Sequence, residues 1–220
     1  MTRVLIATSS AGKLRDFAGA AASHQVEIAA LPGFASLPEV EEDGATFEAN
    51  ARKKAEYYSR AASGELVLAD DSGLAVDALG GAPGVRSARY AADATGPQSG
   101  SRDAMNNARL LRELTTIPDG QRSARFVCVI AVARAGDTVA TFRGEAGGII
   151  LRQQRGTGGF GYDPLFFVPE LGKTFAELSA EEKAAVSHRG RAFRRFLEWL
   201  AADSSLKGNS DPSSAAADEG

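Results

Sequence analysis

The first part of the chain alternates short apolar runs with a stretch of helical spacing. Residues 3–8 and 26–31 are apolar runs of strand length, and residues 12–23 between them carry apolar side chains at helical intervals. We therefore expect the chain to open with a buried strand, a polar turn and a helix, followed by a second short strand.

A longer helix and a wholly apolar strand are predicted next. Thr46 is a typical N-cap residue for a helix that we expect to extend to about residue 62, and Gly64 would close it. Residues 66–69 form an apolar strand that is expected to stop at Asp70. Strands this apolar, alternating with helices, indicate an α/β sheet that helices cover on both faces.

Long extended stretches follow in the second half of the chain. After a helical segment over residues 102–114, residues 124–134 and 138–151 have the pattern of two strands joined by a turn at 135–137. These two stretches predict an antiparallel hairpin.

The chain is expected to finish with a helix and a tail. Ser179 and Glu182 form a capping box, and the apolar stripe of the closing helix consists of Phe193, Phe196, Leu197 and Leu200. From residue 203 onward, Ser, Ala, Asp and Gly leave almost nothing to bury. We expect one domain over residues 1–202 and a disordered tail over residues 203–220.

Composition narrows the class of protein. Hydrophobic residues make up 44% of the 220 residues and charged residues 24%, which suits one compact domain with a sizeable core. Lys and Arg are scattered and the net charge is -3, so a nucleic-acid-binding surface is not indicated. A small anionic molecule is the expected partner.

Sequence features also bear on location. The single cysteine, Cys128, lies in the apolar run 126–131, where a buried, inert thiol is expected and a nucleophile is the alternative. The apolar stretch after Arg3 is too short for a signal peptide, and no segment reaches membrane-spanning length. We therefore expect a soluble, cytoplasmic protein with no membrane partner.

The first candidate for chemistry is the polar turn after the opening strand. A helix N-terminus offers unpaired N–H groups and a positive dipole end to a phosphate. The turn lacks the glycine spacing of a Walker loop, so a polar turn with a solvated lysine is the alternative. The candidate phosphate-binding residues are Thr8, Ser9, Ser10, Ala11, Gly12 and Lys13.

Two adjacent carboxylates, Asp70 and Asp71, follow the apolar strand 66–69, where α/β sheets tend to place ligands. Backbone alternation points them in different directions, so one could hold a magnesium ion near a water that is deprotonated. The alternative is a turn without chemistry. The acidic run 39–43 could add a second metal ligand, although such runs are often solvated faces.

Two further segments could contact a bound ligand. Asn50 and Lys54 are four residues apart on the expected helix, so both could reach a phosphate; a solvent-facing pair is the alternative. Residues 156–164 are rich in glycine, which lets a flat ligand approach the backbone, and Phe160 could stack on a base. A structural turn that buries its own aromatic rings is the alternative there.

Donors at the start of the closing helix complete the candidates. Lys183 lies near Ser187, His188 and Arg189, whose donors could read acceptor atoms on a purine edge. His24, at the end of the first helix, is expected to be a solvated charge. No second His or Cys stands at ligand spacing beside His188, which disfavours a zinc site.

Taken together, these segments resemble the inosine/xanthosine triphosphate pyrophosphatase family, from Thr8 to about Arg195. Its most specific parts are five ordered motifs: Phe-Glu-Ala-Asn-Ala at 47–51 with Lys-Ala at 54–55, Ala-Asp-Asp-Ser-Gly-Leu at 69–74, Gly-Gly-Ala-Pro-Gly-Val at 80–85 with Ser-Ala-Arg-Tyr at 87–90, Gly-Phe-Gly-Tyr-Asp-Pro at 159–164, and Ser-His-Arg at 187–189. Five ordered matches of this length are hard to obtain by chance.

The resemblance implies both a fold and an activity. The fold would be an elongated α/β structure with a mixed sheet flanked by helices and two lobes around a nucleotide cleft, commonly as a homodimer. The activity would be the magnesium-dependent hydrolysis of ITP, dITP and XTP to the monophosphate and pyrophosphate. Such an activity cleanses the nucleotide pool of purines that would otherwise enter DNA and RNA.

The resemblance also implies roles for single residues. Asp71 would be the proton acceptor and a magnesium ligand, and Glu42 would be the second metal carboxylate, with Glu39 and Glu41 as competitors. Residues 8–13 would contact the substrate. The other implied substrate-binding residues are Ser72, Phe160, Gly161, Tyr162, Asp163, Lys183, His188 and Arg189.

The sequence departs from the family pattern at two positions. Ser10 stands where the family usually has Asn, and a hydroxyl donates to phosphate with a shorter reach, so phosphate affinity could be lower than in relatives. Arg86 stands where many relatives have an aromatic residue, which affects only local packing.

Three other functions stay open on the sequence alone. One is a pyrophosphatase for modified pyrimidine triphosphates, and another is a nucleotide sensor that binds without hydrolysis. The third is an interaction domain with an incidental cleft. The presence of Lys13, Asp70 and Asp71 argues against the sensor.

Overall fold

The computed structural model describes residues 2–10, 12–14, 17, 26–93 and 100–202. Most of the helix expected over residues 12–23 lies outside the described residues, as do Ala11, His24 and the expected tail. The division into one domain and a tail therefore stays a prediction.

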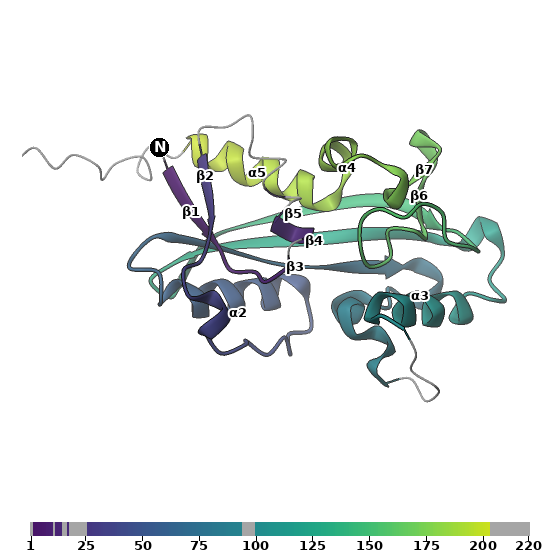
Figure 1. Cartoon of the computed structure of the whole chain (residues 1–220), viewed down its shortest axis with the longest axis horizontal. Helices are drawn as coiled ribbons and strands as arrows, with labels where there is room; N and C mark the ends of the chain where they lie inside the picture. Colours follow the sequence, from purple (N-terminus) through teal and green to yellow (C-terminus); the bar gives the residue numbers. More distant parts are fainter. Residues whose placement is uncertain (1, 11, 15–16, 18–25, 94–99, 203–220) are drawn as a thin grey trace, which may run out of the picture.

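A seven-stranded mixed sheet forms the centre of the molecule, in the order β2-β1-β3-β4-β5-β6-β7. β1 pairs in parallel with β2 and β3, whereas every pairing from β3 onward is antiparallel. The long strands β3, β4 and β5 give the sheet its elongated shape (Figure 1). The strands are β1 Thr2–Ile6, β2 Val26–Ala30, β3 Leu66–Val76, β4 Ser123–Arg134, β5 Asp137–Ile150, β6 Phe166–Val168 and β7 Lys173–Thr174.

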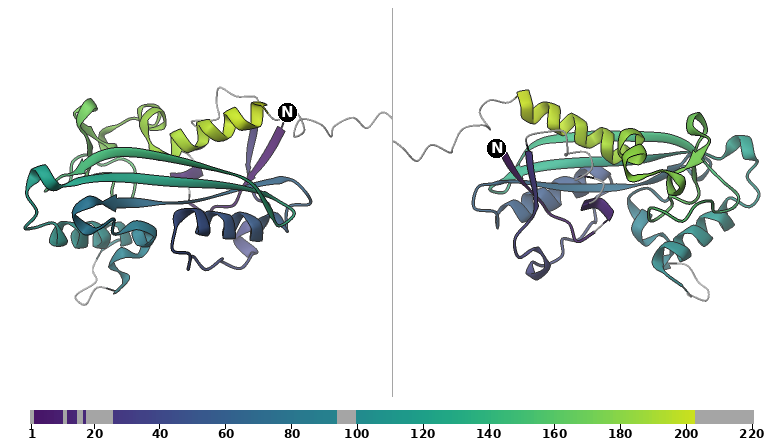
Figure 2. Two further views of the ribbon diagram at one scale, coloured as in Figure 1. Left: turned by 180° about the vertical axis from the view of Figure 1, so that it is seen from behind. Right: turned by 45° about the horizontal axis from the view of Figure 1, so that its top comes forward.

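Helices cover both faces of this sheet, as the apolar strands predict. α4 and α5 lie on one face, and α2 and α3 lie on the other at opposite ends of the long strands (Figures 1 and 2). Because side chains alternate along β3, Leu66 and Leu68 enter the core beneath α5, whereas Val67 and Ala69 enter the core beneath α2. The helices are α2 Phe47–Ser59, α3 Arg102–Glu113, α4 Ala180–Val186 and α5 His188–Ala202.

A third core builds the other end of the molecule. Leu110 of α3 belongs to it, together with Leu74 of β3, Phe126 of β4 and Phe166 of β6. The 3-10 segment Gly84–Asp93 packs between α3 and β3 at this end. The two ends of the long strands thus have separate cores, and the predicted α/β architecture with an elongated mixed sheet is confirmed.

β3 is longer than the sequence predicts. The expected stop at Asp70 is wrong, because the strand continues to Val76 and pairs Asp70 with Ile130 and Asp71 with Val129. The carboxylates of Asp70 and Asp71 lie beside charged side chains, and the backbone at both residues keeps its hydrogen bonds to β4. Both carboxylates therefore lie inside a paired strand and not in a turn at the sheet edge.

Most other element boundaries agree with the sequence. Thr46 caps α2 through a hydrogen bond from Ala49, although α2 ends at Ser59 and not near residue 62. The antiparallel hairpin of β4 and β5 is confirmed, and α5 begins at His188 as expected. None of the helices in the described part of the chain is long and apolar enough to cross a membrane.

Candidate active site

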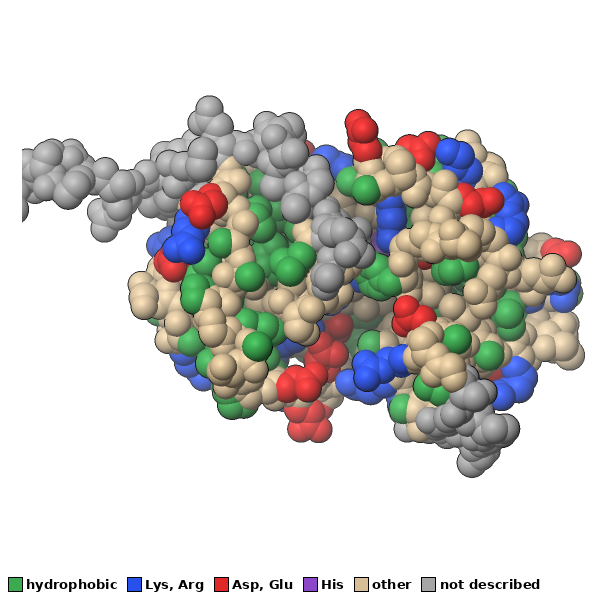
Figure 3. Space-filling view, in the orientation of Figure 1, with side chains coloured by type: hydrophobic (Ala, Val, Ile, Leu, Met, Phe, Trp, Pro, Cys, Tyr) green, Lys and Arg blue, Asp and Glu red, His purple; other side chains and the backbone are tan. Residues whose placement is uncertain are grey.

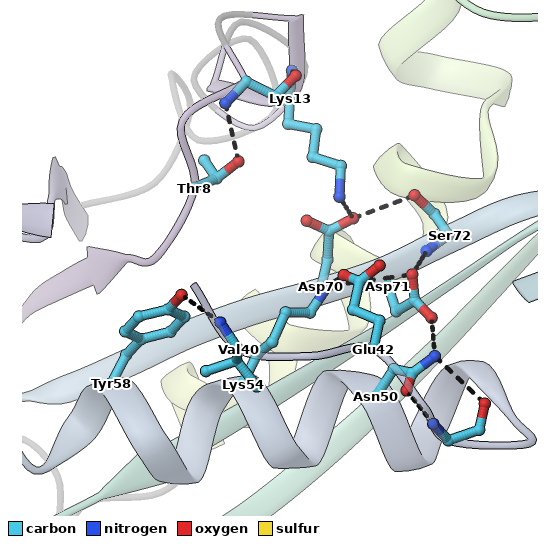
Figure 4. Close-up of polar contacts among 12 residues, drawn as sticks. Thr8, Lys13, Val40, Glu42, Asn50, Lys54, Tyr58, Asp70, Asp71 and Ser72 are labelled. Atoms are coloured by element: carbon cyan, nitrogen blue, oxygen red, sulfur yellow. Dashed lines mark hydrogen bonds and ion pairs between the residues drawn. The ribbon is translucent and has the colours of Figure 1, made fainter. Parts of the chain in front are cut away.

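Asp70 and Asp71 are neighbours on β3 whose carboxylates serve different partners, as strand alternation predicts (Figure 4). The Asp70 carboxylate lies 2.9 Å from the Lys13 ammonium and 3.8 Å from the Arg189 guanidinium. The Asp71 carboxylate accepts a hydrogen bond of 3.0 Å from the Asn50 amide. Asp70 therefore links the turn 8–13 to α5, whereas Asp71 faces α2.

The first turns of α2 bring Asn50 and Lys54 to the same face, as their spacing predicts. Lys54 forms an ion pair with Glu42, and its ammonium lies 4.0 Å from Asp71 Oδ1. Asn50 is only 1% exposed, and its amide N–H groups point at Asp71 and at the backbone carbonyl of Gly44. In this arrangement Asn50 has no free donor for the phosphate contact that we expected.

Burial and nearby opposite charges have opposing effects on the pKa values of Asp71 and Lys54. Burial raises the pKa of Asp71 and Glu42 raises it further, while Lys54 acts in the opposite direction. Burial acts to lower the pKa of Lys54, but the three carboxylates around it outweigh burial and raise that pKa overall. Lys54 therefore keeps its proton and its charge.

The carboxylates of Glu42 and Asp71 are suited to hold a metal ion. Both carboxylates lie near the Lys54 ammonium, so the space between the two carboxylates favours a positive charge. In the part of the chain that the structure describes, no three His, Cys, Asp or Glu side chains form a metal-binding group. A pair of carboxylates is the protein ligand set typical of Mg²⁺, which also uses substrate phosphates.

Of the three acidic residues considered for the second ligand, Glu42 is the one that shares a partner with Asp71. Glu41 is exposed, and Glu39 is exposed at the rim of the neighbouring cavity. The Glu42 side chain is held in place, because Lys54 pairs with its carboxylate and Arg89 donates to its backbone carbonyl.

A cavity of about 360 Å³ is lined by Glu42 and Asp70, whereas Asp71 is not part of its lining. Acidic and basic side chains gather at the hollow between the two ends of the molecule (Figure 3). The Ser10 hydroxyl accepts a hydrogen bond of 3.3 Å from the Lys13 N–H, and Thr8 Oγ1 accepts one of 3.1 Å from the Ser10 N–H. The candidate residues that line the cavity are Thr8, Ser9, Ser10, Lys13, Glu42, Lys54 and Asp70.

The residues expected around a base also come together. The Lys183 ammonium and the Arg189 guanidinium lie 4.9 Å and 5.0 Å from the centre of the Phe160 ring. Lys183 forms a buried ion pair of 2.6 Å with Asp163, which also accepts a 2.9 Å hydrogen bond from the Phe160 N–H. Burial raises the pKa of Asp163, and the adjacent Lys183 opposes this rise.

Tyr162 and His188 are both buried, and they differ in how their polar atoms are used. The Tyr162 hydroxyl donates to the backbone carbonyl of Ser87 at 2.9 Å, so its side chain belongs to the core and leaves only its backbone for a ligand. The His188 ring stacks on Phe126 at 4.7 Å, and neither ring nitrogen has a hydrogen-bond partner among the described residues. Burial lowers the pKa of His188 well below its ordinary value, so the ring is neutral.

Two contacts join the residues expected to bind phosphate, in the turn 8–13, to the residues expected to bind a base, around Phe160. We call these two groups the phosphate end and the base end. Arg189 donates a hydrogen bond of 2.7 Å to the Ser72 hydroxyl, next to Asp70. Gly12 lies against Phe160, because a Cβ atom at Gly12 would be 2.7 Å from that ring. The first turn and the glycine-rich loop therefore contact each other.

Arg89 and Asp103 support the site although we did not predict them as functional residues. Arg89 donates to the backbone carbonyl of Glu42, and its guanidinium lies 3.9 Å from the Glu42 carboxylate. Asp103 accepts a hydrogen bond of 2.7 Å from the Gly161 N–H. The Ser-Ala-Arg-Tyr motif marks Arg89 in the sequence, whereas Asp103 resembles any acidic residue in the first turn of a helix.

A mixed α/β sheet, paired carboxylates beside a polar cavity, and a cation-lined aromatic ring define the class of α/β proteins that act on nucleotides. The chain belongs to the Ham1 family, whose model matches residues 4–199. It is 54% identical over 197 residues to the dITP/XTP pyrophosphatase of Acidobacterium capsulatum. The alignment covers 89% of this chain and 96% of that protein. The corresponding protein of Geobacter sulfurreducens is 52% identical over 200 residues, or 91% of this chain and 97% of its own.

Solved structures agree with this family membership. A HAM1 protein from Coxiella burnetii has a TM-score of 0.79 at 37% identity, over 92% of this chain and 100% of the other. The dITP/XTP pyrophosphatase from Mycobacterium abscessus has a TM-score of 0.67 at 40% identity, over 89% of this chain and 99% of the other.

Proposed function

We propose that this protein hydrolyses ITP, dITP and XTP to the corresponding monophosphate and pyrophosphate. The observation that carries the proposal is the Lys54 ammonium between Glu42 and Asp71, at the rim of a cavity that Lys13 also lines. Relatives that share about half of their residues with this chain are named dITP/XTP pyrophosphatase. The activity would keep these purines out of DNA and RNA.

Magnesium is the proposed cofactor, and Asp71 and Glu42 are the residues that would hold it. The fit rests on two carboxylates that already share a cation and on the preference of Mg²⁺ for carboxylate oxygen. When bound, Mg²⁺ supplies positive charge to the triphosphate and lowers the pKa of bound water.

Asp71 is the proposed proton acceptor for the attacking water. The water oxygen forms a bond to the α-phosphorus while the bond to the oxygen bridging the α- and β-phosphates breaks, and pyrophosphate leaves. Lys13 and Lys54 stabilise the negative charge that develops on this leaving group. For that role, Lys13 exchanges its contact with Asp70 for one with the phosphates.

Base selection rests on the 6-oxo group that hypoxanthine and xanthine share. Lys183 and Arg189 beside the Phe160 ring offer only donors, which suit an oxo group and oppose the 6-amino group of adenine. Guanine also has a 6-oxo group, so its rejection depends partly on the 2-amino group. Phe160 stacks on the base.

The direct test is pyrophosphate release from ITP, XTP, dITP, GTP, ATP and dUTP, with and without magnesium, by wild type and Asp71→Asn. We expect fast magnesium-dependent release from ITP, dITP and XTP that the variant lacks. Preferential release from dUTP would instead identify a pyrimidine enzyme, and binding without release would identify a sensor. Near-normal turnover by a folded Asp71→Asn variant would remove Asp71 from its assigned role.

A homodimer in the cytoplasm is the proposed working state. Support for it comes from the family resemblance. Light scattering after size-exclusion chromatography would test it, with twice the chain mass expected and the single chain mass contradicting it.

A further inference from the structure

One residue of the glycine-rich loop, Gly161, is held on both of its backbone polar groups by α3. Its N–H donates to the Asp103 carboxylate at 2.7 Å, and its carbonyl accepts from the Asn107 amide at 2.9 Å. Asp103 and Asn107 are four residues apart and therefore project from one face of α3. We call this pair the α3 clamp.

The clamp acts on a backbone that only glycine adopts readily. Gly159 and Gly161 have φ values of 71° and 63°, in the left-handed region, and they flank Phe160 on both sides. Within the loop, the Phe160 N–H donates to Asp163. The Phe160 carbonyl also accepts from the Asp163 N–H at 3.3 Å. Asp163 thus holds the loop at Phe160 and α3 holds it at Gly161, so the direction of the ring depends on both supports.

The Phe160 ring in turn occupies the centre of the base end. It lies within 5.0 Å of both the Lys183 ammonium and the Arg189 guanidinium, and it faces Gly12 of the first turn. The hydrogen bonds of Asp103 and Asn107 to the loop are both made to the backbone of Gly161, next to Phe160.

The α3 clamp is built into a well-anchored helix. Asn107 is 3% exposed, and its neighbour Asn106 accepts from the Ala91 N–H at 2.7 Å and donates to the carbonyls of Ser87 and Ala88. The helix is therefore held to the 3-10 segment Gly84–Asp93 by Asn106, which does not take part in the clamp. The Tyr162 hydroxyl of the loop donates to the same Ser87 carbonyl, so this segment supports both α3 and the loop.

We infer that Asp103 and Asn107 are positioning residues that hold the Phe160 ring in the orientation needed to stack on the purine. The inference rests on the proposed function, whose substrate supplies that purine. Stacking needs a ring of defined height and tilt, and the two hydrogen bonds at Gly161 provide it before the ligand arrives.

The test compares variants that remove one hydrogen bond with variants that keep it. Asn107→Leu has a similar branched shape but cannot donate to the Gly161 carbonyl, and Asp103→Leu removes the acceptor of the Gly161 N–H. Asp103→Asn keeps an acceptor oxygen and serves as the conservative variant. Each protein is assayed for KM and kcat with ITP in magnesium, and for binding of IMP in EDTA by calorimetry.

We expect Asn107→Leu and Asp103→Leu to raise KM for ITP and to weaken IMP binding by about tenfold, as loss of a stacking contact does, with a smaller change in kcat. Asp103→Asn should remain near the wild type. In a Phe160→Ala background the clamp substitutions should have no further effect on IMP binding, because their target is already absent.

Ser101→Ala is the control for a destabilised helix, since the Ser101 hydroxyl caps α3 by accepting from the Ala104 N–H and Ser101 is not one of the two residues that bind Gly161. It should lower the Tm but leave IMP binding unchanged. Equal weakening by the Ser101 and Asn107 variants, or full additivity with Phe160→Ala, would overturn the inference. Absence of pyrophosphate release by the wild type would refute the proposed function instead, and IMP binding would still decide the role of the clamp.

Discussion

The buried amide of Asn50 on α2 donates a hydrogen bond of 3.0 Å to the carboxylate of Asp71 on β3. The oxygen of the same amide accepts a hydrogen bond of 2.8 Å from the Gly44 N–H. Gly44 permits this approach, because a Cβ atom there would lie 2.6 Å from Asn50 Oδ1. Asn50 thus joins the strand that carries Asp71 to the loop that carries Glu42.

Replacement of Asn50 by Asp should therefore lower kcat more than it raises KM. The new carboxylate cannot donate to Asp71 and repels it, so we expect a loss of about 10- to 100-fold in kcat, equivalent to ~1.5–3 kcal/mol for a hydrogen bond to a charged group. The measurement is pyrophosphate release from ITP at saturating magnesium. Lys53→Ala, on the solvent side of the same helix, is the control and should change kcat by less than about twofold. An unchanged kcat in Asn50→Asp would show that the amide does not position Asp71.

The case of Asn50 shows which part of the site can be predicted from the sequence. Its position on one helix face with Lys54 follows from local helical geometry and was predicted correctly. Its partner depends on β3, whose continuation to Val76 is decided by pairing with β4, which begins only at Ser123. Sequence patterns describe local structure well, but they do not describe such non-local pairing.

The base end illustrates the same limit. Glycine density and an aromatic residue mark the loop around Phe160 in the sequence, so the loop could be proposed as a ligand site. The residues that hold it, Asp103 and Asn107, stand on an ordinary helical segment with nothing unusual nearby. Their role becomes visible only when α3 packs beside the loop.

Substitution of Gly12 by Ala should impair substrate binding without much loss of stability. A Cβ atom at Gly12 would lie 2.7 Å from the Phe160 ring, so the ring must move out of its position at the base end. We expect KM for ITP to rise by about tenfold, which corresponds to ~1.4 kcal/mol. Gly120→Ala is the control, because a Cβ atom there meets nothing within 4 Å. A normal KM for Gly12→Ala, together with an unchanged Tm, would mean that the position of the ring does not limit binding.

Asp70 should make stability depend on pH in a direction that can be worked out. Burial acts to raise the pKa of Asp70, but Lys13, Arg189 and Lys54 outweigh burial and lower it below 3.8. The native state therefore stays ionised where the unfolded chain takes up a proton. The stabilisation from Asp70 is present above the unfolded value and is lost as the pH falls through the lower folded value.

The corresponding experiment is urea unfolding of wild type and Asp70→Asn between about pH 7 and about pH 3. The wild type should be more stable at neutral pH, because the variant leaves the Lys13 and Arg189 charges without their carboxylate. The difference in unfolding free energy should shrink as the pH falls below 3.8. A difference that stays constant over this range would exclude a lowered pKa at Asp70.

The buried ion pair of Lys183 and Asp163 offers a way to separate folding from base recognition. Lys183→Met leaves the Asp163 carboxylate buried without its partner, which should cost about 3 kcal/mol of stability. The double variant Lys183→Met/Asp163→Asn removes both charges, and the new amide oxygen still accepts from the Phe160 N–H, so stability should largely return. KM for ITP should stay high in both variants, since a donor beside Phe160 is missing in each. Urea unfolding and steady-state kinetics measure the two effects separately; if the double variant regained a normal KM along with its stability, Lys183 would serve the fold alone.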